Sequence, residues 1–590
     1  MIAALVGAAL IPATAVAGVP GYERERVDAF DFHLFDLGTA DHDGDDDLDL
    51  YTLNHLARQS LLANDGTGAF EERLFEAGLA QTRAFPGWEG REGPEVTGPG
   101  LYLSARSGIF LRHVGGGRVR GSVAFLFRPR ARAEGGVDVA VRRRRAPGPD
   151  RFVASFDMSP GSRLRLEPPR KAHPYEVHVR RPFPLDRVFA GSLERSPRQR
   201  RFELYLRDRH GMAWADLAGG AGTDVFIVRG GLRGRITDVA GAIRDELLLG
   251  RDGSFRPAGI AGSVHKGTCR GRAAGAADFA GDARLDLFST CKGRGPQLHR
   301  GTAGGGFEPA PGLRRAGVRT DVMRFADLDG DAQLELLATY ARRFEVFDRG
   351  SGGWRRVQSV PGRHSDRKNA QVAAADADGD GDQDLYVASA TGSTLLRNVD
   401  GRLRPRNPGE LGLPRRARAA AWADHDNDGD QDLLAVPGGL HEQDGGFDFS
   451  RVGALRTVDA PAEARIAWPD LDLDGARDAV ISARSRRSAR RFKTYAFANQ
   501  ADAGHWLELD LSGRARNRQA IGARVRVRAG GESQTQWVGQ NETAFYSQGH
   551  YRLYFGLDDA TSATVEVRWP SGRTRDYGPF AADQLVELGE

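Results

Sequence analysis

Five short acidic segments carry carboxylates at a fixed spacing that suits a metal ion. They begin at Asp41, Asp327, Asp376, Asp424 and Asp470, and each has acidic side chains at positions 1, 3, 5 and 9 of a nine-residue loop. Calcium prefers oxygen ligands, a backbone carbonyl near position 7 could add one, and glycine at position 6 permits the turn. The sequence therefore predicts Ca²⁺ as the cofactor, with these ligands: Asp41, Asp43, Asp45, Asp49, Asp327, Asp329, Asp331, Glu335, Asp376, Asp378, Asp380, Asp384, Asp424, Asp426, Asp428, Asp432, Asp470, Asp472, Asp474 and Asp478.

These segments, named loops 41, 327, 376, 424 and 470 after their first residues, differ from two other types of calcium loop. An EF-hand needs a bidentate acid at position 12, where these loops have Thr52, Ala338, Val387, Ala435 and Ile481. Tandem nine-residue calcium repeats follow one another directly, whereas these loops stand far apart. Loops 376, 424 and 470 have glycine at position 6 and fit the calcium pattern best; loops 41 and 327 have Asp46 and Ala332 there.

Two further segments keep the frame of the loop but lack part of the ligand set. Asp216–Asp224 and Asp278–Asp286, named loops 216 and 278, have alanine at position 3. We expect an Asx-rich turn without a metal ion in both. Position 2 varies among the seven loops, and the histidines found there, His42 and His425, are expected to face solvent.

The seven loops recur through the chain and are flanked by short apolar runs. After a first gap of 175 residues, they start at intervals of 62, 49, 49, 48 and 46 residues. Runs such as 225–228 and 433–436 are too short for helices and too apolar for loops, so they are predicted to be buried strands. A period near 48 residues with several strands per unit is typical of a β-propeller blade. The sequence therefore predicts an all-β fold built on a seven-bladed β-propeller.

The repeat resembles the FG-GAP/VCBS repeat family over residues 24–96 and 206–500. This resemblance implies a calcium-bearing propeller of the kind that also forms integrin ectodomain heads. The first blade is then expected at 24–96 and the remaining blades at 206–500.

The long gap between loops 41 and 216 holds about a hundred residues more than one blade needs. Alternating apolar runs at 123–127, 137–141 and 202–206 predict a β-sandwich inserted into the propeller at 97–205. Residues 111–209 contain 24 Arg or Lys and 10 Asp or Glu, a net charge of +14, which leaves −10 for the rest of the chain. The densest basic run is Arg142, Arg143, Arg144 and Arg145. It is either a face for an acidic partner, a solvated surface, or a contact with the acidic propeller.

The last 90 residues follow a different pattern, with alternating strands predicted at 523–527 and 564–568. Segments 517–527, 551–557 and 565–572 closely resemble the ASPIC/UnbV domain, so a small β-domain is expected at 501–590. Its position after FG-GAP-type repeats resembles the cartilage acidic protein-like family. The resemblance brings no catalytic constellation with it.

The N-terminus and the two cysteines indicate export. Residues 2–18 carry no charge and end in small residues, which is typical of a secretory signal peptide with Ala15-x-Ala17 as its cleavage site, so we predict a signal at 1–17. An uncleaved anchor is the alternative. Cys269 and Cys291 can pair outside a reducing compartment, although two separate thiols are also possible. No other segment of the sequence is long and apolar enough to span a membrane.

Composition and motifs favour a binding protein over an enzyme. With 83 basic and 79 acidic residues and 40% hydrophobic residues, the chain is neither a disordered acidic tail nor a multi-pass membrane protein. No nucleophile elbow, phosphate loop, zinc-protease motif or nucleic-acid-binding signature occurs. The sequence predicts a secreted, periplasmic or cell-surface protein that binds a protein or an anionic glycan, without catalysis. The alternatives are a polysaccharide-active enzyme such as a lyase and a purely structural envelope component.

Overall fold

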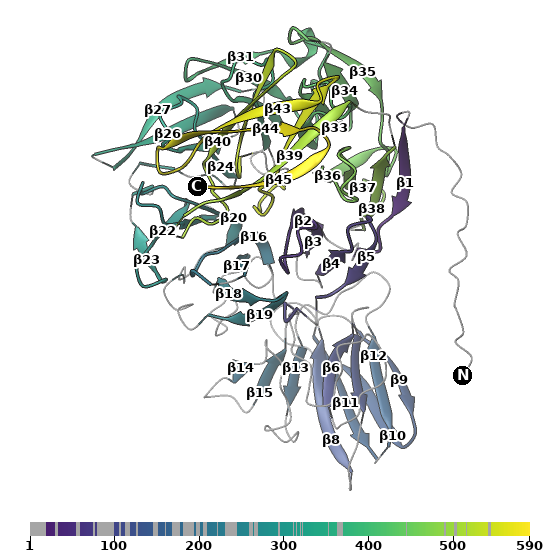
Figure 1. The fold of residues 1–590 in the computed structure, drawn as a ribbon. Coiled ribbons are helices and arrows are strands. Elements are labelled where there is room, and N and C mark those ends of the chain that lie inside the picture. The colour runs from purple at the N-terminus through teal and green to yellow at the C-terminus, as the bar shows by residue number, and fades with distance from the viewer. Residues whose placement is uncertain are drawn as a thin grey trace, which may run out of the picture.

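Seven four-stranded antiparallel sheets form the largest part of the described chain in this computed structural model (Figure 1). The structure describes residues 19–590 with gaps, the longest of which are 80–99, 168–176, 181–193, 231–244 and 363–369. Within the described residues the seven sheets match in number the seven loops of the sequence, and each is called a blade. The predicted signal peptide at 1–17 lies outside the described residues.

The strands of each blade follow one another in chain order, except in the last blade. Blade 1 contains β2 (Leu34–Ala40), β3 (Asp49–Asn54), β4 (Ser60–Asn64) and β5 (Phe70–Glu72); blade 2 contains β16 (Arg209–Ala215), β17 (Asp224–Arg229), β18 (Glu246–Arg251) and β19 (Ser254–Pro257); blade 3 contains β20 (Gly271–Ala277), β21 (Asp286–Cys291), β22 (Gln297–Gly301) and β23 (Phe307–Ala310). Blade 4 contains β24 (Met323–Ala326), β25 (Glu335–Thr339), β26 (Arg343–Gly350) and β27 (Gly353–Pro361); blade 5 contains β28 (Gln371–Ala375), β29 (Asp384–Ala388), β30 (Thr394–Val399) and β31 (Arg402–Arg406). Blade 6 contains β32 (Ala419–Ala423), β33 (Asp432–Val436), β34 (Gly439–Gln443) and β35 (Phe449–Gly453), and blade 7 contains β36 (Pro461–Ala467), β37 (Ala479–Ser485), β38 (Lys493–Asn499) and β1 (Tyr22–Arg26). A short 3-10 helix, η3 (Pro408–Glu410), links blades 5 and 6.

Apolar clusters between neighbouring blades close the seven sheets into a ring. One cluster joins blades 1 and 2, a larger one joins blades 2, 3 and 4, and others join blades 4 to 5, 5 to 6 and 6 to 7. Leu37 and Leu50 of blade 1 pack with Ala467 and Val480 of blade 7, which completes the circle. The second strand of a blade packs on both neighbours, so strands such as β29 and β33 are buried on both faces. This explains why the sequence shows continuous apolar runs there instead of alternation.

The N-terminal strand corrects the predicted boundary of the first blade. The range 24–96 starts inside β1, but β1 pairs antiparallel with β38 of blade 7, with Tyr22 opposite Asn499. Blade 1 begins only at β2. The first described strand thus completes the last blade and ties the two ends of the ring together by backbone hydrogen bonds.

The inserted domain consists of two sheets that Figure 1 shows side by side. One has the order β6 (Gly100–Ser104), β7 (Gly108–Arg112), β12 (Arg163–Glu167), β9 (Arg130–Glu134), and the other β10 (Val137–Arg144), β11 (Arg151–Met158), β8 (Val119–Phe125), β13 (Val177–Arg180), β15 (Arg201–Leu204), β14 (Glu194–Arg195). Phe156 and Met158 of one sheet and Leu164 and Leu166 of the other are buried, as a two-sheet core requires.

The predicted basic face Arg142–Arg145 lies only partly within the described residues. Arg142, Arg143 and Arg144 are consecutive residues of β10, and successive side chains of a strand point to opposite sides of the sheet. Arg142 and Arg143 are exposed, and Arg145 lies outside the described residues. A second group of arginines is found on the other sheet, where Arg130 and Arg163 are exposed on the neighbouring strands β9 and β12.

The C-terminal domain contains two further sheets around their own apolar core. They are the three-stranded sheet β42 (Leu553–Asp558), β39 (His505–Ser512), β45 (Gln584–Gly589) and the four-stranded sheet β41 (Glu532–Trp537), β40 (Arg524–Ala529), β43 (Ser562–Arg568), β44 (Thr574–Ala581). Leu509, Val525, Phe555, Val565 and Trp569 are among the core residues. The structure therefore has the small β-domain expected at 501–590.

Cys291 is buried at the end of β21 and is disulfide-bonded. Its predicted partner Cys269, the other cysteine of the chain, lies outside the described residues. Among the described residues, no helix combines the length and the apolar character needed to cross a membrane.

Candidate metal centres

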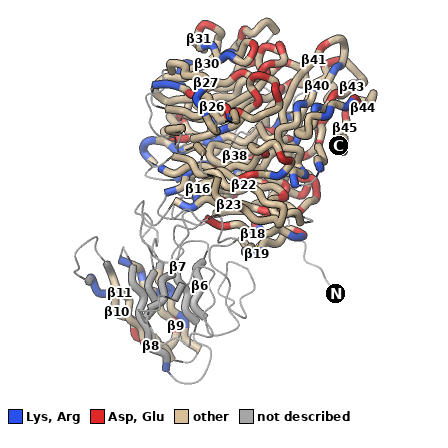
Figure 2. The backbone as a smooth tube through the Cα atoms, turned by 90° about the vertical axis from the view of Figure 1, so that its left-hand side faces the viewer, with Lys and Arg blue, Asp and Glu red and all other residues tan. Residues whose placement is uncertain are grey.

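Each acidic loop joins the innermost strand of its blade to the second strand. Loop 41 connects β2 to β3, for example, and loop 376 connects β28 to β29. Because the innermost strands of all blades start their hairpins in the same way, the seven loops share one end of the ring, here called the loop face. Figure 2 shows acidic segments near the C-terminal strands β40–β45.

The first carboxylate of each loop holds the turn together. Asp376 Oδ2 accepts a hydrogen bond from the Gly381 N–H at 3.0 Å, and Asp424 Oδ2 accepts one from Gly429 at 2.9 Å. Position 6 has a positive φ even where it is not glycine, with 70° at Asp46 and 73° at Ala332. The turn interpretation of position 6 is therefore correct for all five predicted sites. Position 4 also has a positive φ in every loop: Gly44, Gly219, Gly281, Gly330, Gly379, Asn427 and Leu473.

The last carboxylate of each loop closes the hairpin. Asp478 Oδ2 accepts from the Leu471 N–H at 2.8 Å, and its Oδ1 accepts from the Asn499 N–H on β38 at 2.8 Å. The same pair of contacts recurs at Asp49, Asp384 and Asp432. Asp224 of loop 216 keeps this arrangement although its loop lacks the ligand set. Position 9 therefore has a structural role that is independent of a metal ion.

Three asparagines that we did not predict link neighbouring blades at the loop face. Asn64, Asn398 and Asn499 each give their backbone N–H to the position-9 carboxylate of their own blade. Their side chains donate to the position-2 carbonyl of the preceding blade's loop, at Leu471 (2.7 Å), Leu328 (2.8 Å) and His425 (2.8 Å) respectively. The recurring sequence signal is an asparagine 14 to 21 residues after position 9.

The predicted ligands of loops 41, 327 and 376 lie close together. One carboxylate oxygen from each of Asp41, Asp43 and Asp45 lies within 4.8 Å of the others; the same holds for Asp327, Asp329 and Glu335, and for Asp376, Asp378 and Asp380. In loop 424, burial first and then the charges of Asp426 and Asp428 raise the pKa of Asp424 well above its usual range. In loop 470, burial and the charge of Asp470 raise the pKa of Asp472. The acidic clusters could therefore bind metal ions.

Unpartnered oxygens test whether a cation fits these clusters. Buried oxygens without a hydrogen-bond donor occur at these ligands: Asp327 Oδ1, Asp376 Oδ1, Asp378 Oδ1, Asp424 Oδ1, Asp426 Oδ1 and Asp472 Oδ1. A buried carboxylate oxygen without a partner is costly. A cation bound by these oxygens removes that cost, so loops 327, 376, 424 and 470 fit a metal ion.

The loops without the full ligand set use arginine instead. In loop 278, Asp282 at position 5 forms ion pairs with Arg284 and with Arg300, the latter at 2.6 Å. In loop 216, Arg518 lies 3.6 Å from Asp216. A guanidinium group thus supplies positive charge where a metal ion is not expected. Loop 376 combines both features, because Arg397 pairs with Asp378.

The two loop histidines are buried, which corrects the expectation that they face solvent. His42 is 4% exposed and its Nδ1 lies 2.5 Å from Asp49 Oδ2, while His425 is 6% exposed and its Nε2 lies 3.0 Å from Glu442 Oε1. The backbone N–H of position 2 donates a hydrogen bond to the position-9 carboxylate. This hydrogen bond orients the position-2 side chain toward the interior of the blade. In loop 41 the histidine already pairs with Asp49, so this loop has the least need of a cation.

The pKa values of the clustered carboxylates predict how pH affects the metal-free protein. Burial, together with the charges of neighbouring carboxylates, raises the pKa of Asp41 and Asp376 to about 7 and that of Asp384 to about 8. A pKa that is raised in the folded state stabilises the fold at low pH, and this stability is lost as pH rises through the folded pKa. The melting temperature of the metal-free protein should therefore fall as pH rises from about 4, near the ordinary aspartate pKa, to about 8, and more steeply than that of the calcium-loaded protein. Calorimetry on resin-stripped and calcium-loaded samples measures this effect. The same dependence of melting temperature on pH in both samples would contradict the prediction.

The substitution Asp224→Asn tests the structural role of position 9 apart from metal binding. Asp224 accepts hydrogen bonds from the Leu217, Ala218 and Gly250 N–H groups at 2.9 to 3.0 Å. In the variant, the NH₂ group of the asparagine side chain would face a backbone N–H donor instead of accepting from it. The free energy of unfolding should therefore fall by about 2–3 kcal/mol. The loss in denaturant titrations should be equal with and without calcium. The exposed Asp252→Asn of the same blade is the matched control, and a loss that calcium repairs would contradict the structural role.

The C-terminal domain covers the loop face and contacts every loop. Its contacts are mainly hydrogen bonds to loop backbone atoms: Arg552 to the Asp46 carbonyl (2.7 Å), Arg518 to Gly220 (3.3 Å), Arg524 to Gly381 (3.2 Å), Arg568 to Gly330, the Gly504 N–H to Asp426 (2.8 Å), and the Leu285 N–H to the Arg516 carbonyl (3.4 Å). At loop 470, Glu508 contacts Asp470. The C-terminal domain is therefore docked extensively on the propeller, which the sequence did not predict.

One segment of the C-terminal domain, residues 544–551, enters the centre of the ring. The Gln548 carbonyl accepts from the Trp214 N–H of β16 at 2.9 Å, and the Tyr546 carbonyl accepts from Ala274 of β20 at 2.8 Å. Asp36 of β2 accepts from the N–H groups of Phe545 (2.9 Å) and Tyr546 (2.8 Å). This channel segment therefore forms backbone hydrogen bonds with the innermost strands of blades 2 and 3, and its N–H groups bind the Asp36 carboxylate of blade 1.

Comparisons with known proteins match two parts of the chain. Residues 513–590 match the family described as ASPIC and UnbV, and residues 327–387 and 376–435 match the FG-GAP-like repeat. No curated protein matches the chain.

Among solved structures, the chain is similar to the V. cholerae biofilm matrix protein Bap1, at 14% identity and a TM-score of 0.26, covering 52% of this chain and 58% of that one. It is also similar to the Dos1 propeller, at 9% identity and a TM-score of 0.31, covering 55% and 73%. The extracellular domain of a putative one-component system from B. thetaiotaomicron gives 8% identity and a TM-score of 0.30, covering 92% and 68%. The chain thus spans just over half of the biofilm protein's length. The matched regions confirm the predicted FG-GAP-type repeats and the C-terminal ASPIC/UnbV domain.

Proposed function

We propose that this protein is an exported calcium-binding β-propeller that acts in binding or adhesion outside the cell or at the cell envelope. The observation that carries the calcium part is the set of buried, unpartnered carboxylate oxygens in loops 327, 376, 424 and 470. An all-oxygen site built from several carboxylates in a flexible loop suits calcium better than zinc or copper, which prefer nitrogen and sulfur ligands. Calcium then has a structural role at the loop face.

The partner is a protein or an anionic glycan, and the inserted domain is the part of the chain that attracts it. Its charge of +14 contrasts with −10 for the remainder. Arg130 and Arg163 are exposed on adjacent strands of one sheet, and Arg142 is exposed on the other. A surface of this charge raises the association rate of an acidic partner and makes binding depend on salt.

A non-enzymatic role is part of the proposal. The centre of the ring, where a lyase of this architecture would need its catalytic base, contains the channel segment 544–551 at the loop face. Residues 544–550 are buried there. The segment fills the space that a polymer would otherwise enter from this side.

A glycan and protein array with the full chain in calcium buffer tests the binding role. We expect an anionic ligand whose binding weakens at high salt and falls at least tenfold in the variant Arg130→Glu/Arg163→Glu. The variant Glu532→Gln, an exposed change in the C-terminal domain, is the control. An array without any ligand would favour a structural envelope component, and new reducing or unsaturated ends on an acidic glycan would favour a lyase.

A further inference from the structure

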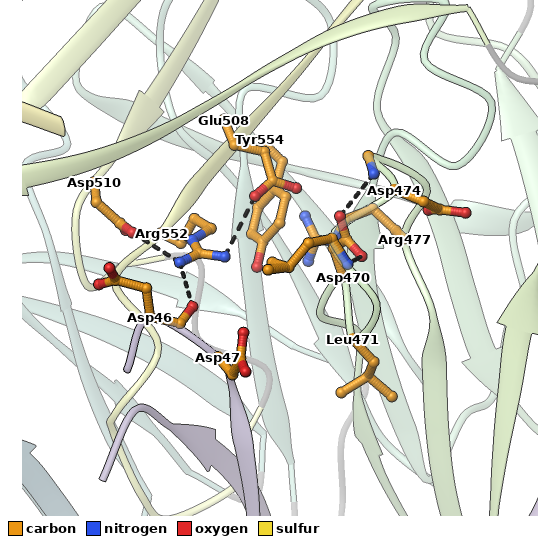
Figure 3. Close-up of polar contacts among 12 residues, drawn as sticks. Asp46, Asp47, Asp470, Leu471, Asp474, Arg477, Glu508, Asp510, Arg552 and Tyr554 are labelled. Carbon is orange, nitrogen blue, oxygen red and sulfur yellow. Dashed lines mark hydrogen bonds and ion pairs between the residues drawn. The ribbon is translucent and has the colours of Figure 1, made fainter. Parts of the chain in front are cut away.

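Glu508 of the C-terminal domain lies directly against loop 470 of blade 7. It comes from β39 and is 2% exposed, and Asp470 at position 1 of the loop is fully buried. Figure 3 shows the Glu508 carboxyl group between Arg552 and Asp470. Two domains therefore bring buried carboxyl groups into one place.

The arginines near this pair are committed to other groups. Arg552 donates to Asp510 through Nε (3.0 Å) and Nη2 (2.9 Å), and its Nη1 lies 3.5 Å from Glu508 Oε2. Arg477 donates to the Trp468 carbonyl at 2.7 Å and lies 3.6 Å from the centre of the Tyr554 ring. Asp510 neutralises Arg552, so one guanidinium group remains against the five acids Asp470, Asp472, Asp474, Asp478 and Glu508. The resulting excess of negative charge favours the binding of a divalent cation.

Each of the two domains contributes a buried carboxylate oxygen without a hydrogen-bond partner: one in loop 470 and one on β39 beside it. Glu508 Oε1 and Asp472 Oδ1 are buried and receive no hydrogen bond. Glu508 Oε2 faces Arg552, which leaves Oε1 as the oxygen available to the loop. An all-acid contact of this kind needs either a shared proton or a cation.

We propose that Glu508 is an additional ligand of the calcium ion of loop 470, so that one ion joins blade 7 to the C-terminal domain. This inference rests on the proposed calcium binding. The ion would receive oxygen ligands from loop 470 and one from β39, and its release would loosen β39 from the loop face. Loop 470 thereby differs from the other loops, whose described contacts with the C-terminal domain go mainly through backbone atoms and arginines.

The substitution Glu508→Gln distinguishes a ligand from a proton-sharing structural group. Glutamine is nearly isosteric and can still donate a hydrogen bond to Asp470, so a purely structural contact survives the change. If Glu508 is a calcium ligand, the substitution should weaken calcium binding, because a neutral amide oxygen replaces a charged carboxylate oxygen. In calcium-free buffer the variant should melt at or above the wild-type temperature, since one buried like charge is removed. In calcium it should melt below wild type.

The measurements are calcium titration calorimetry and hydrogen exchange on the full chain. We expect Glu508→Gln to weaken one class of sites at least tenfold and to abolish the calcium-induced protection of 505–512, and we expect Asp472→Asn on the propeller side to do the same. Glu532→Gln should behave as wild type. Wild-type affinity, stoichiometry and protection in Glu508→Gln would overturn the inference while leaving calcium binding intact. A wild-type chain that binds no calcium would overturn both proposals.

Discussion

Stripping calcium from the full chain is expected to lower its melting temperature by roughly 10 °C. Extracellular calcium modules bind with a Kd of about 0.1–1 mM, and at about 1 mM calcium a site at the tight end contributes about 1.4 kcal/mol. Five independent sites would contribute about 7 kcal/mol, which is comparable to the whole stability of many domains. The reason lies in the loops, where buried carboxylates without donors repel one another once the ion has left.

Calorimetry on resin-stripped protein, before and after calcium is restored, measures this effect. Magnesium at the same concentration should restore little of the lost stability, because it demands a tighter octahedral geometry and dehydrates reluctantly. Asp28→Asn, an exposed change outside the loops, should respond to calcium as wild type does. An unchanged melting temperature after stripping would show that arginines and protons already satisfy the loops.

Replacing Asp36 with alanine is expected to destabilise the docking of the C-terminal domain by about 3–5 kcal/mol. Asp36 is fully buried and accepts hydrogen bonds from the Phe545 and Tyr546 N–H groups and from the Ser547 hydroxyl at 2.8 Å. It also lies 3.7 Å from Arg465. Its removal leaves these donors without their acceptor. Arg465 still donates to the Phe35 and Ala464 carbonyls but loses this nearby carboxylate as a charge partner.

Limited proteolysis and hydrogen exchange over 505–590 follow the undocking. We expect Asp36→Ala to expose the channel segment to protease while blade 1 stays folded, because Asp36 is not needed for the β2–β3 hairpin core at Leu37 and Leu53. The deletion of 505–590 distinguishes undocking from global unfolding, since its ring should be no less stable than that of Asp36→Ala. Wild-type protease resistance in Asp36→Ala would contradict the role given to this contact.

The sequence alone was sufficient to predict the repeat because one loop performs two tasks. The acid at position 9 closes the hairpin in every blade type, as Asp224 and Asp478 show, so it persists even where metal ligands are lost. The apolar second strands are continuous because each is covered by two blades. Both signals are local, with the same period, and they therefore identify the strands and the loops together.

The domain docking could not be predicted because its contacts join residues far apart in the chain. Asp36 and Phe545 are separated by 509 positions, and the groups that meet are mostly backbone atoms, which leave no trace in the residue types. The position of β1 in blade 7 has the same cause, since Tyr22 pairs with Asn499 through the backbone. The burial of His42 and His425 follows from the hydrogen bond between the position-2 N–H and the position-9 carboxylate. The sequence does not reveal this bond, because the residue type at position 2 varies among the loops.

The calcium content of the full chain tests the central claim most directly. Protein dialysed against calcium buffer and measured by elemental analysis should carry up to five calcium ions per chain, and the variants Asp424→Asn and Asp472→Asn should each carry one fewer. Control variants at Asp224 and Asp252, in the blade of loop 216, should keep the full number. A calcium content equal to that of the dialysis buffer would contradict the account.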